Sequence, residues 1–242
     1  MNKLKIGTSG WVYKHWMDIF YPPNLPSDQQ LSFYAQHFAT VEINFSFYRL
    51  PERSVFETWH KQTPSNFLFA VKGSRYLTHM KKLKDPIEPL SRIMERASGL
   101  QEKLGPILFQ FPHTWHINIE RLQPFLELLQ TYPKQKFTVE FRHSSWLIPQ
   151  VYQLLETAGV GLCLPVSPTV PLDICLTAPW TYIRMHSGQW NVGYTDEELS
   201  TWVERIRSFL MQEIDVYVYF NNDPDGNAIR DAQRLYCLLG SC

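Results

Sequence analysis

The sequence predicts an α/β barrel of eight parallel strands, of the TIM-barrel (β/α)8 type. Eight short apolar runs with the character of strands alternate with helix-like segments, roughly one pair every thirty residues, as in a parallel sheet with right-handed crossovers. The 242 residues fit one such barrel, and no linker composition divides them. We therefore expect a single domain over residues 1–242, with a doubly wound open sheet as the alternative fold.

The N-terminal elements follow from local patterns. Residues 4–8 are apolar enough for a strand, and prolines then break the chain before a helix at 28–38, for which Ser27 offers an N-cap. Residues 40–50, TVEINFSFYRL, alternate apolar and polar side chains with the period of a strand. Because helix-like segments lie on both sides, we expect a barrel strand there.

The middle of the chain continues the alternation. A helix at 53–62 follows Pro51, and NFLFAVK at 66–72 is the third strand. The connection 73–85 is long and basic, and such loops in compact domains are usually functional or mobile. A helix at 87–104, a strand at 106–111, a helix at 118–130 capped by Asn118 and a strand at 137–141 complete this part.

The C-terminal third has the clearest stop and start signals. A helix at 149–158 ends at Gly159, a natural left-handed stop, and a strand follows at 160–166. The proline-rich stretch up to Pro179 predicts no helix, and WTYIRMH at 180–186 is the seventh strand. Thr195 caps a helix at 196–211 with acidic residues in its first turn, before a strand at 216–220 and a last helix at 227–239.

The composition limits which binding partners and which cellular compartment we expect. The formal net charge is zero, so no global field recruits nucleic acid or an acidic membrane. The four cysteines have no CxxC spacing, so we expect reduced thiols rather than a zinc site or a disulfide framework. The chain shows neither a signal-peptide core nor a run of ~20 apolar residues, which predicts a cytoplasmic protein without a membrane partner.

Polar side chains interrupt the strands near their C-terminal ends. Strands buried on both faces should be almost continuously apolar. The residues that break this rule at the same relative depth are Glu42, Lys72, Gln110, Glu140, Arg142, Arg184 and Asn221. One such residue could belong to a structural ion pair, but so many strand ends together favour a shared polar pocket at the C-terminal mouth, where barrel proteins bind ligands.

Several strings in these regions resemble the DUF72 family, also called the YecE-like proteins. They are GTSGW (7 to 11), VEINFSFYRLP (41 to 51), FAVKGSRYLTH (69 to 79), LGPILFQFP (104 to 112), VEFRHSSW (139 to 146), YIRMHSG (182 to 188) and YVYFNNDPDGNA (217 to 228). The resemblance covers essentially the whole chain. It implies a TIM barrel with the matched strings at its mouth, and it implies little about activity, because the family is one of unknown function.

Three residues are candidates for catalysis. Glu42 and Glu140 lie inside strands, and such a pair can serve as general acid and base when one carboxyl has a raised pKa and the other is ionised. The alternative is that basic neighbours such as Arg142 or Lys72 neutralise them and hold the mouth together. His186 ends the seventh strand and is either a proton shuttle or a hydrogen-bonded wall.

The remaining candidates would bind substrate. The cations Lys72, Arg142 and Arg184, with Arg75 in the long loop, suggest an anionic ligand, and salt bridging within the pocket is the alternative. The aromatic side chains of Trp11, Tyr48 and Trp146 could stack on a sugar or a base, and a dry aromatic plug is the alternative. Polar side chains could complete the pocket: Asn44, His79, Gln110, His143, Asn221, Asn222 and Asp223. His79, His143 and His186 with Asp223 have the ligand types for a divalent metal, but without HxH or HExxH spacing a metal is not favoured.

We therefore expect an enzyme of the hydrolase or isomerase type that acts on an anionic small substrate, such as a phosphorylated one. The sequence contains no dinucleotide fingerprint, P-loop or nucleophile elbow, and these two reaction classes ask least of cofactors. The alternative is a non-catalytic protein that binds nucleic acid or a carbohydrate in the same pocket.

Overall fold

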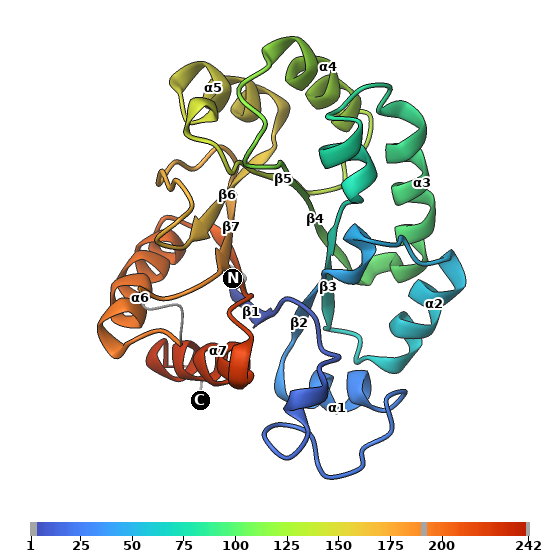
Figure 1. The fold of residues 1–242 in the computed structure, drawn as a ribbon, viewed down its shortest axis with the longest axis vertical. Coiled ribbons are helices and arrows are strands. Elements are labelled where there is room, and N and C mark those ends of the chain that lie inside the picture. Colours follow the sequence, from blue (N-terminus) through green and yellow to red (C-terminus); the bar gives the residue numbers. More distant parts are fainter. Residues whose placement is uncertain (1–3, 190–192, 241–242) are drawn as a thin grey trace.

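Eight parallel strands form a nearly closed barrel in the computed structural model, which describes residues 4–189 and 193–240 (Figure 1). The order of neighbours is β1-β8-β7-β6-β5-β4-β3-β2, and each paired neighbour is parallel. The expected (β/α)8 fold is thereby confirmed. The strands are β1 (Leu4–Thr8), β2 (Thr40–Ile43), β3 (Leu68–Lys72), β4 (Leu104–Gln110), β5 (Phe137–Glu140), β6 (Gly161–Val166), β7 (Trp180–Met185) and β8 (Asp215–Phe220).

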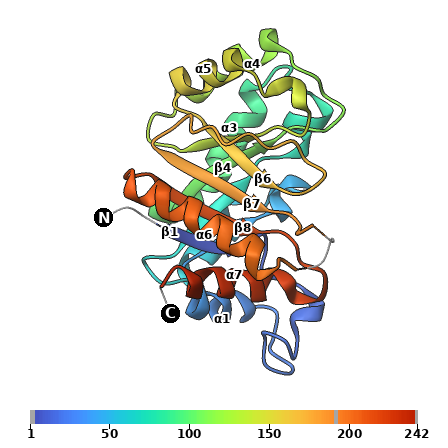
Figure 2. The ribbon, with the colours of Figure 1, turned by 90° about the vertical axis from the view of Figure 1, so that its left-hand side faces the viewer.

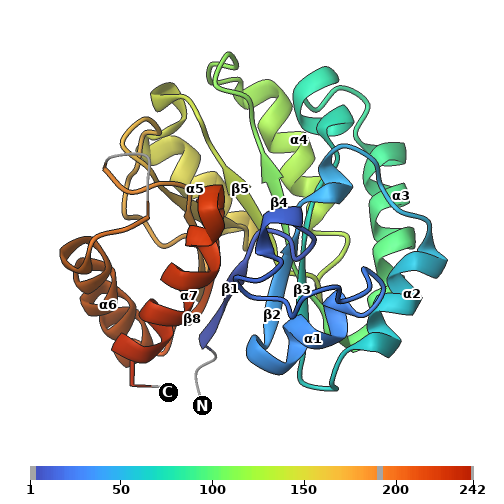
Figure 3. The same ribbon diagram turned by 60° about the horizontal axis from the view of Figure 1, so that its bottom comes forward.

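Helices surround this barrel on the outside (Figures 1 and 3). Figure 2 shows α6 and α7 lying over β7, β8 and β1. The α-helices are α1 (Gln30–His37), α2 (Arg53–Gln62), α3 (Ile87–Ala97), α4 (Ile119–Leu129), α5 (Pro149–Ala158), α6 (Asp196–Met211) and α7 (Asn227–Leu238). Short helical turns are η1 (Lys14–Trp16), η2 (Phe45–Phe47), η3 (Tyr76–Met80), η4 (Ser98–Lys103), η5 (Ser144–Trp146) and η6 (Pro224–Gly226).

The capping signals in the sequence predicted several helix ends correctly. Thr195 and Glu198 form a reciprocal capping box at the start of α6, and the Asn118 side chain caps α4. Gly159 ends α5 at φ 67°, in the left-handed region that glycine favours. The expected cap at Ser27 is wrong, because α1 begins only at Gln30 and Gln29 occupies the N-cap.

The strand expected over residues 40–50 ends at Ile43. Ser46 is buried, and its hydroxyl donates to the carbonyls of Ile43 (2.9 Å) and Lys72 (2.6 Å). These bonds support the turn η2, which stops the alternation and leaves Phe45 exposed. The expected helix 87–104 is likewise shorter, since α3 ends at Ala97 and continues as η4.

A tyrosine side chain closes the barrel between β1 and β2. The Tyr34 hydroxyl accepts from the Thr8 amide (3.0 Å) and donates to the Thr40 carbonyl (3.1 Å). Two residues further on along each segment, the Gly10 amide donates to the Glu42 carbonyl at 2.8 Å. Gly7 permits this approach, because a Cβ there would collide with the Thr40 carbonyl.

Replacing Tyr34 by phenylalanine is expected to lower the free energy of unfolding by about 2 kcal/mol, because a buried amide and a buried carbonyl each lose a partner. Urea unfolding of the variant measures this, with Tyr236→Phe on the exposed side of α7 as the control. Equal stability of both variants would show that the hydroxyl does not hold the seam.

The barrel interior has an apolar floor beneath the polar mouth. Ala70, Leu108, Cys163, Trp180, Tyr182, Tyr217 and Tyr219 form a buried cluster of their own, separate from the core beneath the helices. Alternate residues of a strand share a face, so the residue two positions after a floor residue points to the same interior. This alternation places Lys72, Gln110, Arg184 and Asn221 above the floor.

The structure bears on two expectations from the composition, the absence of a membrane span and the state of the cysteines. No helix among the described residues is long and apolar enough to cross a membrane. Cys163 and Cys175 are free thiols, but Cys237 is disulfide-bonded, so the expectation of reduced cysteines is wrong at that position.

Candidate functional site

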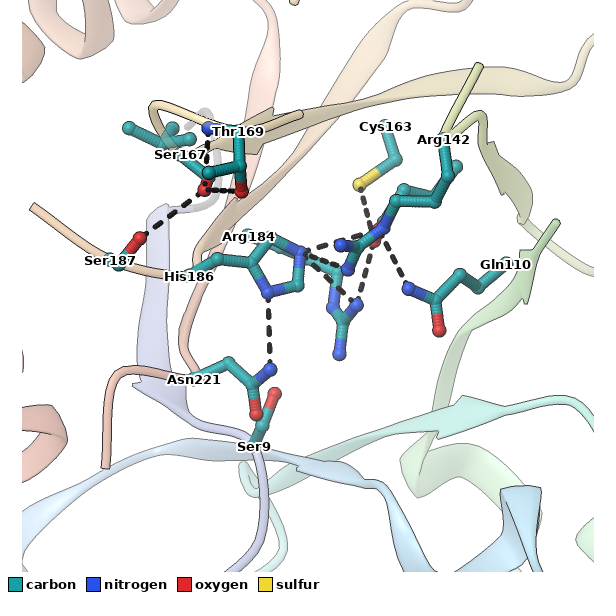
Figure 4. A network of polar contacts seen from close by, with 12 residues as sticks. Ser9, Gln110, Arg142, Cys163, Ser167, Thr169, Arg184, His186, Ser187 and Asn221 are labelled. Atoms are coloured by element: carbon teal, nitrogen blue, oxygen red, sulfur yellow. Dashed lines mark hydrogen bonds and ion pairs between the residues drawn. The ribbon is translucent and has the colours of Figure 1, made fainter. Parts of the chain in front are cut away.

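Arg184, near the end of β7, lies at the centre of the mouth and is fully buried (Figure 4). Its Nε and Nη2 donate to the two carboxylate oxygens of Glu42 at 3.0 and 2.8 Å. Its Nη1 donates to Oε2 of Glu140 at 2.7 Å. One guanidinium thus joins the ends of β2, β5 and β7 through three charge-assisted hydrogen bonds.

Glu42 is saturated with donors. Besides Arg184, the Ser9 hydroxyl donates to Oε1, and the Tyr182 hydroxyl donates to Oε2 at 2.7 Å. Burial opposes ionisation of Glu42, but attraction to Arg184 and Lys72 outweighs it and holds the pKa of the carboxyl below its ordinary value. Glu42 is therefore a permanent anion at neutral pH.

Glu140, at the end of β5, is also surrounded by hydrogen-bond donors and ionised. Its Oε1 accepts from Arg142 Nε and from Gln110 Nε2 (3.0 Å), and Oε2 accepts from Arg184. Burial again opposes ionisation, but attraction to the cations Arg184 and Arg142 holds its pKa well below the ordinary value. The expected pair with one raised carboxyl pKa is not what the structure contains, because both carboxylates are held ionised.

His186 connects this network to β8. Its Nε2 lies 2.9 Å from Arg142 Nη2 and 3.3 Å from Glu140 Oε1, and its Nδ1 lies 3.1 Å from the Asn221 amide (Figure 4). Arginine can only donate, so Arg142 donates to Nε2, which must then be an unprotonated acceptor nitrogen of a neutral ring. Burial lowers the pKa of His186, which keeps the ring neutral at pH 7.

Lys72, the last residue of β3, differs from the other charged groups because its ammonium is uncommitted. Its side chain is buried, and Nζ lies 4.1 Å from the centroid of the Phe47 ring. Within the described residues, no hydrogen bond or ion pair to this Nζ is found. Burial and the cation Arg184 lower the pKa of Lys72 to about 7, since the attraction of Glu42 offsets them only in part.

The long basic connection supplies one side of the rim. His79 in η3 packs edge-on against Phe47, with 4.9 Å between ring centroids, and its Nδ1 lies 2.9 Å from the Thr78 hydroxyl. Burial, Lys72 and Arg75 lower the pKa of His79 to about 4, so it is neutral. Arg75 is exposed just before η3.

Trp146 does not belong to the mouth. It is fully buried in η5, stacks on Phe141 and donates its Nε1–H to the Trp115 carbonyl at 2.7 Å. Its expected role in stacking on a ligand is therefore wrong. His143 lies beside it on the outer rim, where it accepts from the Ser145 amide and stacks on His116 at 3.9 Å between centroids.

Asn222 and Asp223 also turn away from the charged centre. Asn222 is buried and donates to Asp231 of α7 at 2.8 Å. Asp223 accepts from Trp16 Nε1 at 2.6 Å and lies 2.8 Å from His15 Nε2. Asn221, the first residue after β8, differs from these two because it contacts His186 and so joins the charged network.

Trp11, Asn44 and Tyr48 lie together beside the charged centre rather than within it. They line a cavity of about 460 Å³ between the segments that follow β1 and β2. Trp11 is largely buried against Trp59, with 5.0 Å between ring centroids, whereas Tyr48 is exposed. The mouth thus has a charged part and an aromatic part.

The two donors that complete the Glu42 shell, Ser9 and Tyr182, were not among the candidates from sequence. Tyr182 could have been found, because it precedes Arg184 by two residues and must share its face of β7. Ser9 lies in the GTSGW string, but its approach to Glu42 depends on the irregular seam between β1 and β2.

No group of three or more His, Cys, Asp or Glu side chains suited to a metal occurs in the part of the chain that the structure describes. His79, His143 and His186 each have their own separate neighbours, so they do not converge with Asp223.

The fold and the site define an α/β barrel whose C-terminal mouth holds a buried cluster of ionised side chains. A family model described as "Protein of unknown function DUF72" matches residues 5–241. The chain belongs to the DUF72 family, as its sequence motifs indicated.

One curated relative and one solved structure match nearly the whole chain, and a second relative matches about half of it. The chain is 26% identical to the UPF0759 protein YunF of Bacillus subtilis, over 97% of this chain and 94% of that protein. It is 27% identical to the UPF0759 protein YecE of Escherichia coli K12, over 57% of this chain and 48% of that protein. A crystal structure of a DUF72 family protein from Thermotoga maritima has a TM-score of 0.87 at 28% identity and covers 98% of this chain and 99% of its own.

Proposed function

We propose that the barrel mouth is the active site of an enzyme that acts on a small anionic substrate, in a reaction of the hydrolase or isomerase type. The observation that supports this most is the uncommitted ammonium of Lys72. Three cations, Lys72, Arg142 and Arg184, share the mouth with two carboxylates, and Arg184 already uses both carboxylates.

A phosphate or carboxylate would supply what Lys72 lacks. A buried ammonium without hydrogen-bond acceptors loses its hydration, and with Arg184 nearby the attraction of Glu42 makes up only part of the loss, so the pKa of Lys72 falls to about 7. An anion placed beside Nζ would accept its hydrogen bonds and favour the protonated form. Arg142 is partly exposed and could add a planar donor to the same anion.

Lys72 and His186 are the groups suited to proton transfer. The pKa of Lys72 lies near neutral pH, where a general base or acid works best. His186 is neutral, and its ring lies between Arg142 on one side and Asn221 on the other, which limits its orientation. Glu42 and Glu140 would then act through Arg184 by holding the cation in place, and not as the acid and base of the reaction.

Sulfate is a suitable first probe, because its charge does not change between pH 6 and pH 8.5. The proposal predicts that wild type binds sulfate at least about tenfold more tightly at pH 6, where Lys72 is protonated, than at pH 8.5, where it is mostly neutral. His79 does not contribute to this change, because its pKa of about 4 keeps it neutral over that range. Isothermal titration calorimetry measures both affinities.

Two variants show whether Lys72 is responsible. Lys72→Met should lose most of the sulfate affinity and its pH dependence, whereas Lys134→Met, an exposed lysine before the N-terminal end of β5, should behave as wild type. Equal sulfate binding by the two variants would refute the anion site. Binding of sugar phosphates without turnover in a substrate screen would support the non-catalytic alternative.

A further inference from the structure

An aromatic hollow lies next to the proposed anion site. It has a volume of about 460 Å³ and is lined by residues that follow β1 and β2, among them Trp11, Tyr13, Phe45, Tyr48 and Trp59. Phe45 and Tyr48 are 58% and 67% exposed, which is unusual for large aromatic side chains in a folded domain. Such a volume is within the range of small-molecule sites.

The hollow contains one conspicuous unsatisfied polar group. The side-chain oxygen of Asn44 is buried and has no hydrogen-bond partner among the described residues. The Tyr13 hydroxyl, which belongs to the same wall, already donates to the Ser9 carbonyl at 2.5 Å. A buried polar atom without a partner costs free energy, and a turn of the Asn44 side chain toward the hollow would let a ligand satisfy this oxygen.

A single turn of chain joins the hollow to Lys72. Asn44 and Phe45 line the hollow, and Phe47, two residues further on, carries the Lys72 ammonium over its ring. The Ser46 hydroxyl fixes this turn to the end of β3 by donating to the Lys72 carbonyl at 2.6 Å. The backbones of Phe45 and Phe47 are at most about 7 Å apart, and the ammonium lies beyond the Phe47 ring, so one ligand could reach both places if its ring and its anion are at opposite ends.

We infer that the hollow binds the flat heteroaromatic ring of a ligand whose anionic group occupies the site beside Lys72, which makes a phosphorylated nucleoside the fitting chemical class. The inference that a ring binds depends on the hollow alone, whereas the inference that the same ligand carries an anionic group depends on the proposed function. A ring with an N–H edge would lie among the aromatic walls and donate to Asn44.

A carbohydrate ring fits the hollow less well. A sugar carries several hydroxyl groups, and each needs a hydrogen-bond partner once it is removed from water. The walls are mainly aromatic faces, and the Tyr13 hydroxyl is committed to Ser9, so few side-chain polar groups remain: the Asn44 amide, the Tyr48 hydroxyl and the indole N–H groups of Trp11 and Trp59. Base stacking on aromatic side chains needs no such partners, and it tolerates different bases because every base has a π face.

The test compares adenosine 5′-monophosphate with ribose 5-phosphate by calorimetry at pH 6. Wild type should bind the nucleotide about tenfold or more tightly than the sugar phosphate, because only the nucleotide has a ring for the hollow. Tyr48→Ala and Phe45→Ala should remove this advantage and leave ribose 5-phosphate binding unchanged. Both residues are exposed, so the variants should fold. Tyr236→Ala on α7 is the matched control and should keep the full advantage.

The outcomes separate the two hypotheses. Equal affinities of wild type for the two compounds would overturn the ring site and leave the anion site standing. A nucleotide advantage that survives in Tyr48→Ala and Phe45→Ala would overturn its location in the hollow. If neither phosphate compound binds, the anion site fails, and free adenosine decides: binding that Tyr48→Ala abolishes supports the ring site, and no binding overturns it.

Discussion

Replacing Arg184 by methionine is expected to lower the free energy of unfolding by about 3 to 5 kcal/mol. The substitution leaves Glu42 and Glu140 fully buried and without their shared cation. Two buried carboxylates must then either remain ionised without a counterion or take up protons. Urea unfolding of wild type and variant at pH 7 measures the loss.

An exposed ion pair provides the control for this substitution. Arg92 pairs with Glu88 on the outside of α3, so Arg92→Met should change stability by about 0.5 kcal/mol or less. If Arg184→Met does not fold, Arg184→Lys keeps the charge but loses the paired donors to Glu42, and it should show a smaller loss. A loss for Arg184→Met no larger than the control would contradict the role of Arg184 as the tie of the mouth.

Replacing Lys72 by methionine is expected to stabilise the protein at pH 6 by about 2 to 5 kcal/mol. The folded pKa of about 7 lies below the unfolded value, so the wild type carries the full cost of charging this buried amine below pH 7. That cost declines as pH rises from the folded towards the unfolded pKa. The advantage of the variant should therefore shrink by about 2 kcal/mol between pH 6 and pH 9.

Urea unfolding of Lys72→Met and of the surface variant Lys134→Met at both pH values gives the comparison. A variant that gains stability while losing sulfate binding would show that Lys72 is kept for function at the expense of the fold. Equal or lower stability of Lys72→Met at pH 6 would mean that its ammonium is already well compensated, contrary to the account given above.

The fold could be predicted because its signals are local. Alternating apolar patterns marked the strands, and caps such as Thr195 and Asn118 marked the helix ends. Where a side chain from elsewhere intervenes, the local pattern failed. The strand at residues 40–50 stops early because the Ser46 hydroxyl bonds to the end of a neighbouring strand, which no local pattern reveals.

The candidate site was predicted in part for the same reason. Polar residues inside apolar strands pointed to Glu42, Glu140 and Arg184, and the structure brings them together. Their partners could not be assigned, because Arg184 and Glu42 are 142 residues apart and their pairing depends on barrel closure. Trp146 was misplaced because an aromatic residue after a strand packs equally well in a core as in a pocket.

The pKa of the Lys72 side chain is the most direct test of the proposed anion site. It can be followed by NMR of the lysine side chains, with Lys72→Met to assign the signal. We expect the Lys72 side chain to have a pKa near 7 in the free protein and a clearly higher pKa with saturating sulfate, because a bound anion favours the charged amine. An ordinary lysine pKa in the free protein, or a low pKa that sulfate does not change, would contradict it.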